Sequence, residues 1–408
     1  MRLLSVSLVF LFALSDTHTP MRRLMFVITT QENMGDLALC QEWIGDLGRE
    51  QNRFAFVLAS NLSRFVDPSD DCYHFRPSVD IGETIAAAAA DFCPDAVIMA
   101  SNSFWSMKNQ CGAQFGRFPD ELYRLGVPLL SFDPFEIGFR TKVPRANRSF
   151  EFPEIPPKVW RLRYMSRSSN EPNARHFCTQ GVFARALEAS REDVLRKWGA
   201  APAKRTVIFP VSENRFKSIM DSYPRYYLHL ARLFSLKRFA DVQFITVSPR
   251  PVPGLRHVGN VLHVPHLPFS DFLELVAASE LYLSDSLISC MVNAFHLALP
   301  VMLLVNTEKS APLAPGTFLD GRFFPYKIFP YGFTEVSDEL VSRFEIKGCF
   351  VETEVLDIDD FSSKLERLLF NETAYREVSD RCRAWKQARL SLPSPRAILE
   401  NILASEPL

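Results

Sequence analysis

The chain has 408 residues, of which 47% are hydrophobic and 23% are charged, and its formal net charge is −1 at pH 7. A chain of this length exceeds what one ordinary hydrophobic core organises, so we expect two domains of about 200 residues each. The near-zero net charge excludes an overall electrostatic attraction to nucleic acid or to an anionic membrane.

The eight cysteines are scattered without a CxxC pair, and their spacing is not that of metal ligands. Most of them, including Cys40, Cys93 and Cys290, lie in apolar patterns and are expected in the core. His263 and His266 come nearest to a metal-binding pair, but no third ligand accompanies them. We therefore predict no metal site.

Residues 1–20 stand apart from the predicted fold. One arginine followed by an apolar run resembles a short signal peptide, whereas Met21 begins a stretch that leads directly into a first strand. We favour Met21 as the natural start, with a dispensable extension before it and a cytoplasmic protein. If the chain is instead exported, three Asn-x-Ser/Thr sequons become glycosylation sites: Asn61, Asn147 and Asn371. No other segment is long and apolar enough to span a bilayer.

Strands and helices alternate through the predicted first domain, residues 21–180. Strands are expected at 24–30, 54–59, 96–100 and 127–132. Between them we expect a helix that begins near Asn33 and buries Leu37 and Ile44, an Ala-rich helix at 84–92, and a helix that Gly126 terminates. This alternation predicts a parallel, doubly wound sheet with right-handed crossovers.

Residues 134–175 interrupt the alternation. They contain six prolines, and their nine Lys and Arg residues outnumber four Glu. An irregular segment of this length is either a functional lid or a proline-pinned crossover that packs on the surface. As a lid, its arginines would meet an anionic or aromatic substrate.

A connecting segment, 181–204, is expected to hold a helix at 182–198 and a linker, and the second domain occupies 205–408. Strands are predicted at 206–211, 242–247, 261–264, 281–284 and 301–305, and helices at 226–239, 269–278 and 287–299. A Pro- and Phe-rich loop at 309–331 follows. We expect residues 352–385 to be largely helical, in a tail that braces the first domain.

The polar turn Ser284–Asp285–Ser286 separates a predicted buried strand from a predicted helix. Ligands of open α/β sheets bind at such turns because free N–H groups and the helix dipole attract an anion there. Any strand–helix connection also needs a polar turn, so a binding role and a purely structural role both stay open.

Two doubly wound halves that face a central cleft resemble the glycosyltransferase B fold. Three motifs make the chain similar to the ADP-heptose (lipopolysaccharide heptosyltransferase) type. Met34-Gly-Asp-Leu-Ala-Leu resembles that family's GDxxL loop, FPVSENRFK at 209–217 its P-G-[AS]…K segment, and the Ser284 turn with Pro300 its nucleotide-binding helix. The tail is also similar to glycosyltransferase-like proteins of natural-product clusters. Val211 and Leu287 depart from the motifs, which have glycine there.

The resemblance implies roles for individual residues. Asp36 would be the general base for the acceptor, with Glu32 as second choice; an acidic residue in a first helical turn also stabilises the helix dipole without any catalysis. The residues expected to hold the donor diphosphate are Ser212, Arg215, Lys217, Ser284, Asp285, Ser286 and Ser289. Those expected to position the acceptor are Asn33, Gly35, Asp133 and Arg140.

The sequence thus predicts a nucleotide-sugar-dependent glycosyltransferase with a small-molecule or glycan acceptor, in natural-product or surface-glycan biosynthesis. No obligatory cofactor is expected beyond the nucleotide sugar, which is the donor substrate. Two alternatives remain. One is a catalytically inactive protein of the same fold that binds a partner protein, and the other is a nucleotide-sugar epimerase.

Overall fold

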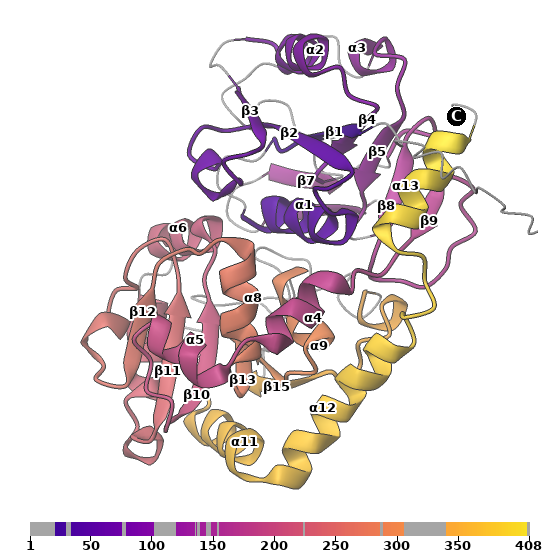
Figure 1. Ribbon diagram of the computed structural model, residues 1–408. Helices are drawn as coiled ribbons and strands as arrows, with labels where there is room; N and C mark the ends of the chain where they lie inside the picture. The colour runs from indigo at the N-terminus through magenta and orange to yellow at the C-terminus, as the bar shows by residue number, and fades with distance from the viewer. Residues whose placement is uncertain are drawn as a thin grey trace, which may run out of the picture.

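A computed structural model describes residues 21–29, 34–75, 79–101, 120–134, 136, 139–143, 148–152, 155–222, 225–285, 289–305 and 340–405. Two sheets of parallel strands, each with helices packed around it, form two domains (Figure 1). The predicted two-domain α/β fold is therefore confirmed. The expectations for residues 1–20, Glu32, Asn33, Ser286 and 309–331 lie outside the described residues.

The first sheet has the strand order β3-β2-β1-β4-β5-β8-β9. Its strands are β1 (Arg22–Val27), β2 (Asn52–Leu58), β3 (Asp71–His74), β4 (Ala96–Met99), β5 (Leu129–Phe132), β8 (Trp160–Arg163) and β9 (Ala174–His176). Its helices are α1 (Met34–Leu47), α2 (Ile81–Phe92) and α3 (Asp120–Tyr123), with the 3-10 turn η1 (Ser63–Phe65). The central strand β1 begins with two arginines and continues as an apolar run from Leu24, which is buried because both faces of the sheet are covered. Phe26 belongs to one hydrophobic cluster with Trp43 of α1, and Val27 belongs to another with Ile85 of α2.

The second sheet has the order β12-β11-β10-β13-β14-β15, which is the 3-2-1-4-5-6 order of dinucleotide-binding folds. Its strands are β10 (Arg205–Pro210), β11 (Val242–Val247), β12 (Val261–Val264), β13 (Leu281–Ser284), β14 (Val301–Val305) and β15 (Phe350–Glu354). Its helices are α6 (Glu213–Ser222), α7 (Arg225–Phe234), α8 (Phe269–Ala277), α9 (Ser289–His296), α11 (Ile358–Phe370) and α12 (Glu372–Gln387). The expectation that 352–385 is largely helical missed β15, the edge strand.

The chain crosses between the domains twice. The first crossing leads from β9 into α4 (Gly181–Glu188) and α5 (Arg191–Lys197), so the single helix predicted at 182–198 is wrong. Its break lies at Ser190, whose hydroxyl caps α5 by accepting a hydrogen bond from the Asp193 amide. The second crossing leads from α12 to α13 (Pro395–Ala404), and the two crossings meet where the Cys178 amide donates to the Pro393 carbonyl at 3.1 Å.

The C-terminal tail returns to the first domain, as predicted. Helix α13 packs against α1, and Figure 1 shows its yellow ribbon beside the first sheet. Arg396 donates to the Leu47 carbonyl at 2.7 Å, and Glu400 lies 3.5 Å from Arg22. The tail therefore holds both domains together.

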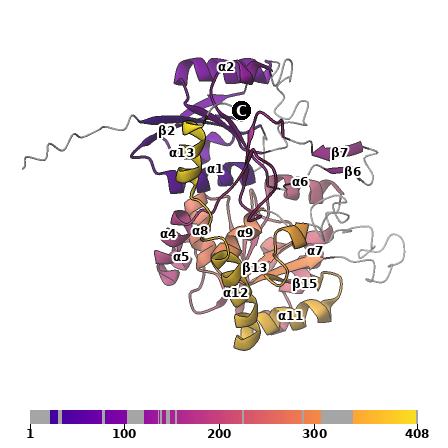
Figure 2. The same ribbon diagram turned by 90° about the vertical axis from the view of Figure 1, so that its right-hand side faces the viewer.

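Residues 134–175 are more regular than predicted. An antiparallel hairpin, β6 (Phe139–Val143) with β7 (Arg148–Phe152), projects from the first domain (Figure 2). Strands β8 and β9 then extend the main sheet. Strand β8 was not predicted because it contains arginines and therefore does not form an apolar run. It is nevertheless buried, because Arg163 lies within an ion-pair network.

Most of the described cysteines are buried, including Cys40, as expected. Cys93 is an exception, because it is exposed and ends α2 in the left-handed conformation at φ 51°. The side chain of Cys290 lies outside the described part of the chain.

Candidate functional site

The strand order reverses once in each sheet. Strand β1 lies between β2 and β4, and β10 lies between β11 and β13, so the loops that follow these neighbouring strands run to opposite faces of the sheet. In open α/β sheets ligands bind at this reversal, beside the carboxyl ends of the strands. The residues predicted from the three motifs follow β1, β10 and β13, at the two reversals.

The described candidates of the first motif lie in the first turn of α1. Gly35 and Asp36 are both partly buried there. Burial, and to a lesser extent the carboxylate of Asp36, raises the pKa of Cys40 one turn further along. Asp36 thus lies at the start of α1, the helix that follows β1 at the reversal of the first sheet. Arg140 lies in β6, and its side chain is outside the description.

The second motif forms the turn between β10 and α6. The Ser212 carbonyl accepts a hydrogen bond from the Phe216 amide at 2.8 Å, which begins the helix. Glu213 lies between two cations, 3.7 Å from Lys217 Nζ and 3.5 Å from Arg250, which follows β11. Among the described side chains, Glu213 thus brings two cations together beside the end of β10. The side chain of Arg215 is not described.

The third motif begins at the carboxyl end of β13, beside the turn after β10. Ser284 and Asp285 are both buried, with 3% and 5% of their surface exposed. Ser289 is the first residue of α9, and its side chain is outside the description. The burial of Asp285 fits a carboxylate that supports the turn better than one that contacts a phosphate.

His266, which follows β12, links two strand ends of the second sheet. Its Nε2 donates to the Val211 carbonyl at 3.2 Å, since a carbonyl only accepts. Burial lowers the pKa of His266; Glu213 opposes this change, and Arg64 adds to it. Arg64 belongs to η1 of the first domain, so a charge of the first domain acts on this end of the second sheet.

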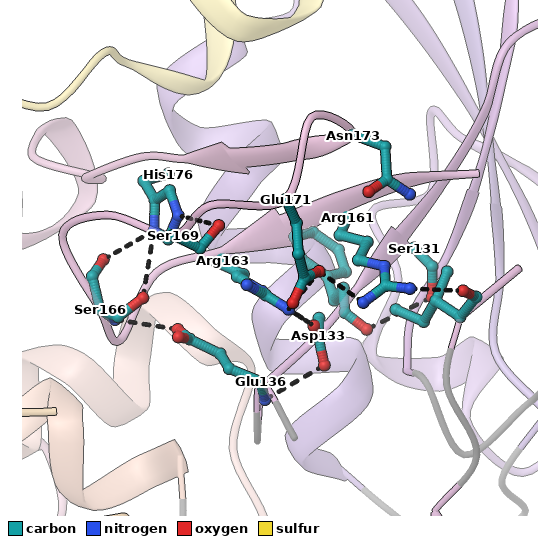
Figure 3. Close-up of polar contacts among 12 residues, drawn as sticks. Ser131, Asp133, Glu136, Arg161, Arg163, Ser166, Ser169, Glu171, Asn173 and His176 are labelled. Atoms are coloured by element: carbon teal, nitrogen blue, oxygen red, sulfur yellow. Dashed lines mark hydrogen bonds and ion pairs between the residues drawn. The ribbon is translucent and has the colours of Figure 1, made fainter. Parts of the chain in front are cut away.

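A network of buried polar residues occupies the end of the first sheet at β5, β8 and β9 (Figure 3). Asp133, predicted to position the acceptor, is only 4% exposed and accepts from Arg163 Nε at 2.9 Å. Arg163 is 1% exposed and also binds Glu171 at 2.9 Å. Burial raises the pKa of Asp133, and the adjacent Arg163 opposes the rise. Asp133 therefore supports this sheet end in the structure, without an exposed carboxylate for a substrate.

Glu136 is a residue of this network that the sequence did not indicate. It is 4% exposed, its φ is 58°, and its Oε1 accepts from the Ser166 amide at 2.9 Å. Burial raises the pKa of its carboxyl to about 7. Non-glycine residues at positive φ are uncommon and are concentrated at functional sites, and a carboxyl with this pKa can both accept and donate a proton. A positive φ at a non-glycine residue cannot be recognised in a sequence pattern. Only the structure therefore shows that Glu136 is strained and buried.

Comparison with known families matches residues 44–406 to DUF6365, described as a family of unknown function. The chain belongs to this family. No curated protein matches the sequence.

Several solved structures share the fold of this DUF6365 protein. A UDP-glucosyltransferase from Polygonum tinctorium superposes with a TM-score of 0.56 at 13% identity, covering 96% of this chain and 100% of that one. The calicheamicin glycosyltransferase CalG4 gives 0.54 at 13% identity, with 94% and 98% covered. The UDP-GlcNAc 2-epimerase of Neisseria meningitidis gives 0.53 at 13% identity, with 94% and 100% covered. The glycosyltransferase B architecture predicted from the sequence is thus confirmed.

Two further findings concern metal ligands and membrane-spanning helices. Among the described residues, no three His, Cys, Asp or Glu side chains are grouped so that they could hold a metal ion. Within the same residues, no helix is long and apolar enough to cross a membrane.

Proposed function

We propose that this protein is a nucleotide-sugar-dependent glycosyltransferase that acts on a small-molecule or glycan acceptor. The observation that carries the proposal is the position of the motifs predicted to bind the donor, at the reversal of a 3-2-1-4-5-6 sheet. The charge of Arg64, from the first domain, lowers the pKa of His266 in the second, which is consistent with a site near the domain boundary. The glycosyltransferases that share this fold support glycosyl transfer as the reaction. The resemblance of the sequence motifs to those of the ADP-heptose type is also part of the proposal.

In this proposal the donor diphosphate lies against the starts of α6 and α9. Backbone N–H groups at a helix start attract an anion, and Lys217 and Arg250 add positive charge. A bound diphosphate would compete with Glu213 for both cations, so the charge of the leaving group is stabilised without an obligatory metal or cofactor. Asp36, across the domain boundary, would take the proton of the acceptor hydroxyl.

Thermal unfolding with the UDP, ADP, GDP, CMP and TDP forms of nucleotides and nucleotide sugars tests the donor site. A ligand at about a hundred times its dissociation constant adds about 2.7 kcal/mol of stability, which raises the midpoint by several degrees. Lys217→Ala should lose this rise. Lys364→Ala should keep it, because Lys364 forms the same i,i+4 ion pair with Asp360 on α11 of this domain. No rise with any nucleotide would refute the donor site and favour the inactive, partner-binding alternative.

The likeness in fold to the UDP-GlcNAc 2-epimerase of Neisseria meningitidis favours a second candidate, a nucleotide-sugar epimerase. Epimerisation through proton removal exchanges a carbon-bound hydrogen of the sugar with solvent, whereas glycosyl transfer does not. The test is incubation of each nucleotide sugar in D2O without an acceptor. Deuterium in the sugar would establish epimerisation, whereas unlabelled sugar that is transferred once an acceptor is added would establish the glycosyltransferase.

A further inference from the structure

Two short segments from different domains meet beside Glu136. Residues 165–167 follow β8 of the first domain, and residues 343–345 precede β15 of the second. Arg167 donates to Glu345 through both Nε, at 2.8 Å, and Nη2, so the two segments share a bidentate ion pair. About half of each side chain is exposed, 47% for Arg167 and 45% for Glu345. We call the pair of segments the latch.

Arg389, in the second crossing, binds both segments of the latch. Its Nη2 donates to the Met165 carbonyl at 2.7 Å and to the Phe344 carbonyl at 2.8 Å, one in each segment. Arg389 is 1% exposed, so these hydrogen bonds are shielded from water. The latch therefore has a buried anchor at Arg389 and a solvent-exposed ion pair at its other end.

Both segments of the latch hold Glu136. The Ser166 amide, from the first segment, donates to the carboxylate of Glu136 at 2.9 Å. Arg343, from the second segment, donates to the Glu136 carbonyl at 3.4 Å. One domain thus holds the side chain of Glu136, and the other holds its main chain.

Backbone strain occurs on both sides of this contact. Glu136 has φ 58° and Glu345 has φ 55°. A non-glycine residue in this region is strained and persists only where its surroundings hold it there. For Glu136 the surroundings include the Asp133 carboxylate, which accepts from its amide at 3.1 Å, in addition to the latch.

We propose that the latch is a positioning device: Arg343 and Glu345 of the second domain hold Glu136 in its buried, left-handed conformation, and separation of the two segments releases it. Arg343 and Glu345 are then positioning residues that act through Glu136. The proposal concerns the conformation of Glu136 and no particular substrate, so it does not depend on which reaction the protein catalyses. It links the relative position of the domains to a buried carboxyl at the end of β5.

A released Glu136 would titrate as an ordinary carboxyl. Burial is the largest cause of its raised pKa, whereas the Ser166 contacts and the charge of Arg163 lower that pKa. The other charged or titratable groups around Glu136 and the latch are Asp133, Glu171, His176, Arg167, Arg343, Glu345 and Arg389. Opening the latch hydrates the carboxyl and leaves Arg163 and Asp133 in place, so the pKa should fall from about 7 toward 4.5.

Carbon NMR of protein labelled at the glutamate carboxyl carbon measures this titration directly. The Glu136 resonance is the one that disappears in Glu136→Gln. We expect its midpoint near 7 in the wild type, and at least one pH unit lower in Arg343→Ala/Glu345→Ala. A midpoint within half a unit of the wild type in the double variant would overturn the proposal.

Hydrogen exchange supplies a second measurement that does not depend on titration. The Ser166 amide, which donates to Glu136, should exchange at least about tenfold faster in the double variant. Glu377→Ala is the matched control, because it removes an exposed ion pair with Arg367 on the far helices and should leave that amide unchanged. Equal exchange of the Ser166 amide in all three proteins would show that the latch does not hold Glu136.

Discussion

Glu42 offers a sharp test of how the domain boundary responds to pH. It lies on α1 and is 5% exposed, and its carboxylate accepts a hydrogen bond from the hydroxyl of Thr179 in the first crossing. Burial raises its pKa from 4.5 to about 7, the Thr179 hydrogen bond opposes the rise, and the nearby Asp46 adds to it. The folded protein therefore retains this proton over a pH range in which the unfolded chain has released it.

The sign and size of the effect follow from this difference. Because the folded pKa lies above the unfolded value, the folded state loses stability as the pH rises from 4.5 to about 7, and the loss is complete above 7. At about 1.4 kcal/mol per pKa unit, ionised Glu42 destabilises the fold by about 3 kcal/mol. Glu42→Gln retains an acceptor for Thr179 and carries no charge. We expect the variant to be more stable than the wild type by less than about 1 kcal/mol near pH 5 and by about 3 kcal/mol near pH 8.

The assay is denaturant unfolding of the wild type and Glu42→Gln at pH 5 and pH 8, followed by a probe in each domain. Glu192→Gln on α5 serves as the control, because its side chain is 57% exposed and its removal should change stability by less than about 0.5 kcal/mol at either pH. A difference between wild type and Glu42→Gln that is the same at both pH values would refute the reasoning from burial.

Two further substitutions test the site and the boundary. Asp36→Asn should abolish transfer from a nucleotide sugar while the unfolding midpoint changes little, because Asp36 is only partly buried; undiminished turnover would exclude it as the base. Arg389→Met should destabilise the protein by on the order of 3 kcal/mol in urea, because it leaves the Met165, Phe344 and Trp385 carbonyls without their donor. Unchanged stability would mean that water replaces the guanidinium.

The sequence predicted those parts of the fold that depend on local pattern. Strands β1, β10 and β13 contain apolar runs because parallel strands are buried on both faces, and polar residues follow each of them in the sequence. Strand order then places these residues at the reversals of the two sheets. The positions of Asp36 and Ser212 after β1 and β10 were therefore predictable from a single sequence.

The remaining features depend on contacts between distant residues. Strand β8 contains two arginines, and it is buried only because Arg163 meets Asp133, 30 residues earlier in the chain. Glu136 is held by Ser166, also 30 residues away, and by Arg343, 207 residues away. No periodic pattern encodes such pairings. The network at the end of β5 could therefore be found only in three dimensions.

The domain boundary combines apolar packing with buried groups that titrate. His296 stacks on Phe183 of α4 at 4.4 Å, and burial lowers its pKa to about 3, so it stays neutral beside Arg389. Glu42, Glu136 and Arg389 are buried at the same boundary, each with hydrogen-bond partners across it or in a crossing segment. Buried ionisable groups add little net stability, but their hydrogen bonds accept only one geometry. Such hydrogen bonds fix one orientation of the two domains. The free energy needed to separate the domains is nevertheless modest, because water can solvate the same groups once they are apart. An enzyme whose donor and acceptor bind on different domains needs both properties.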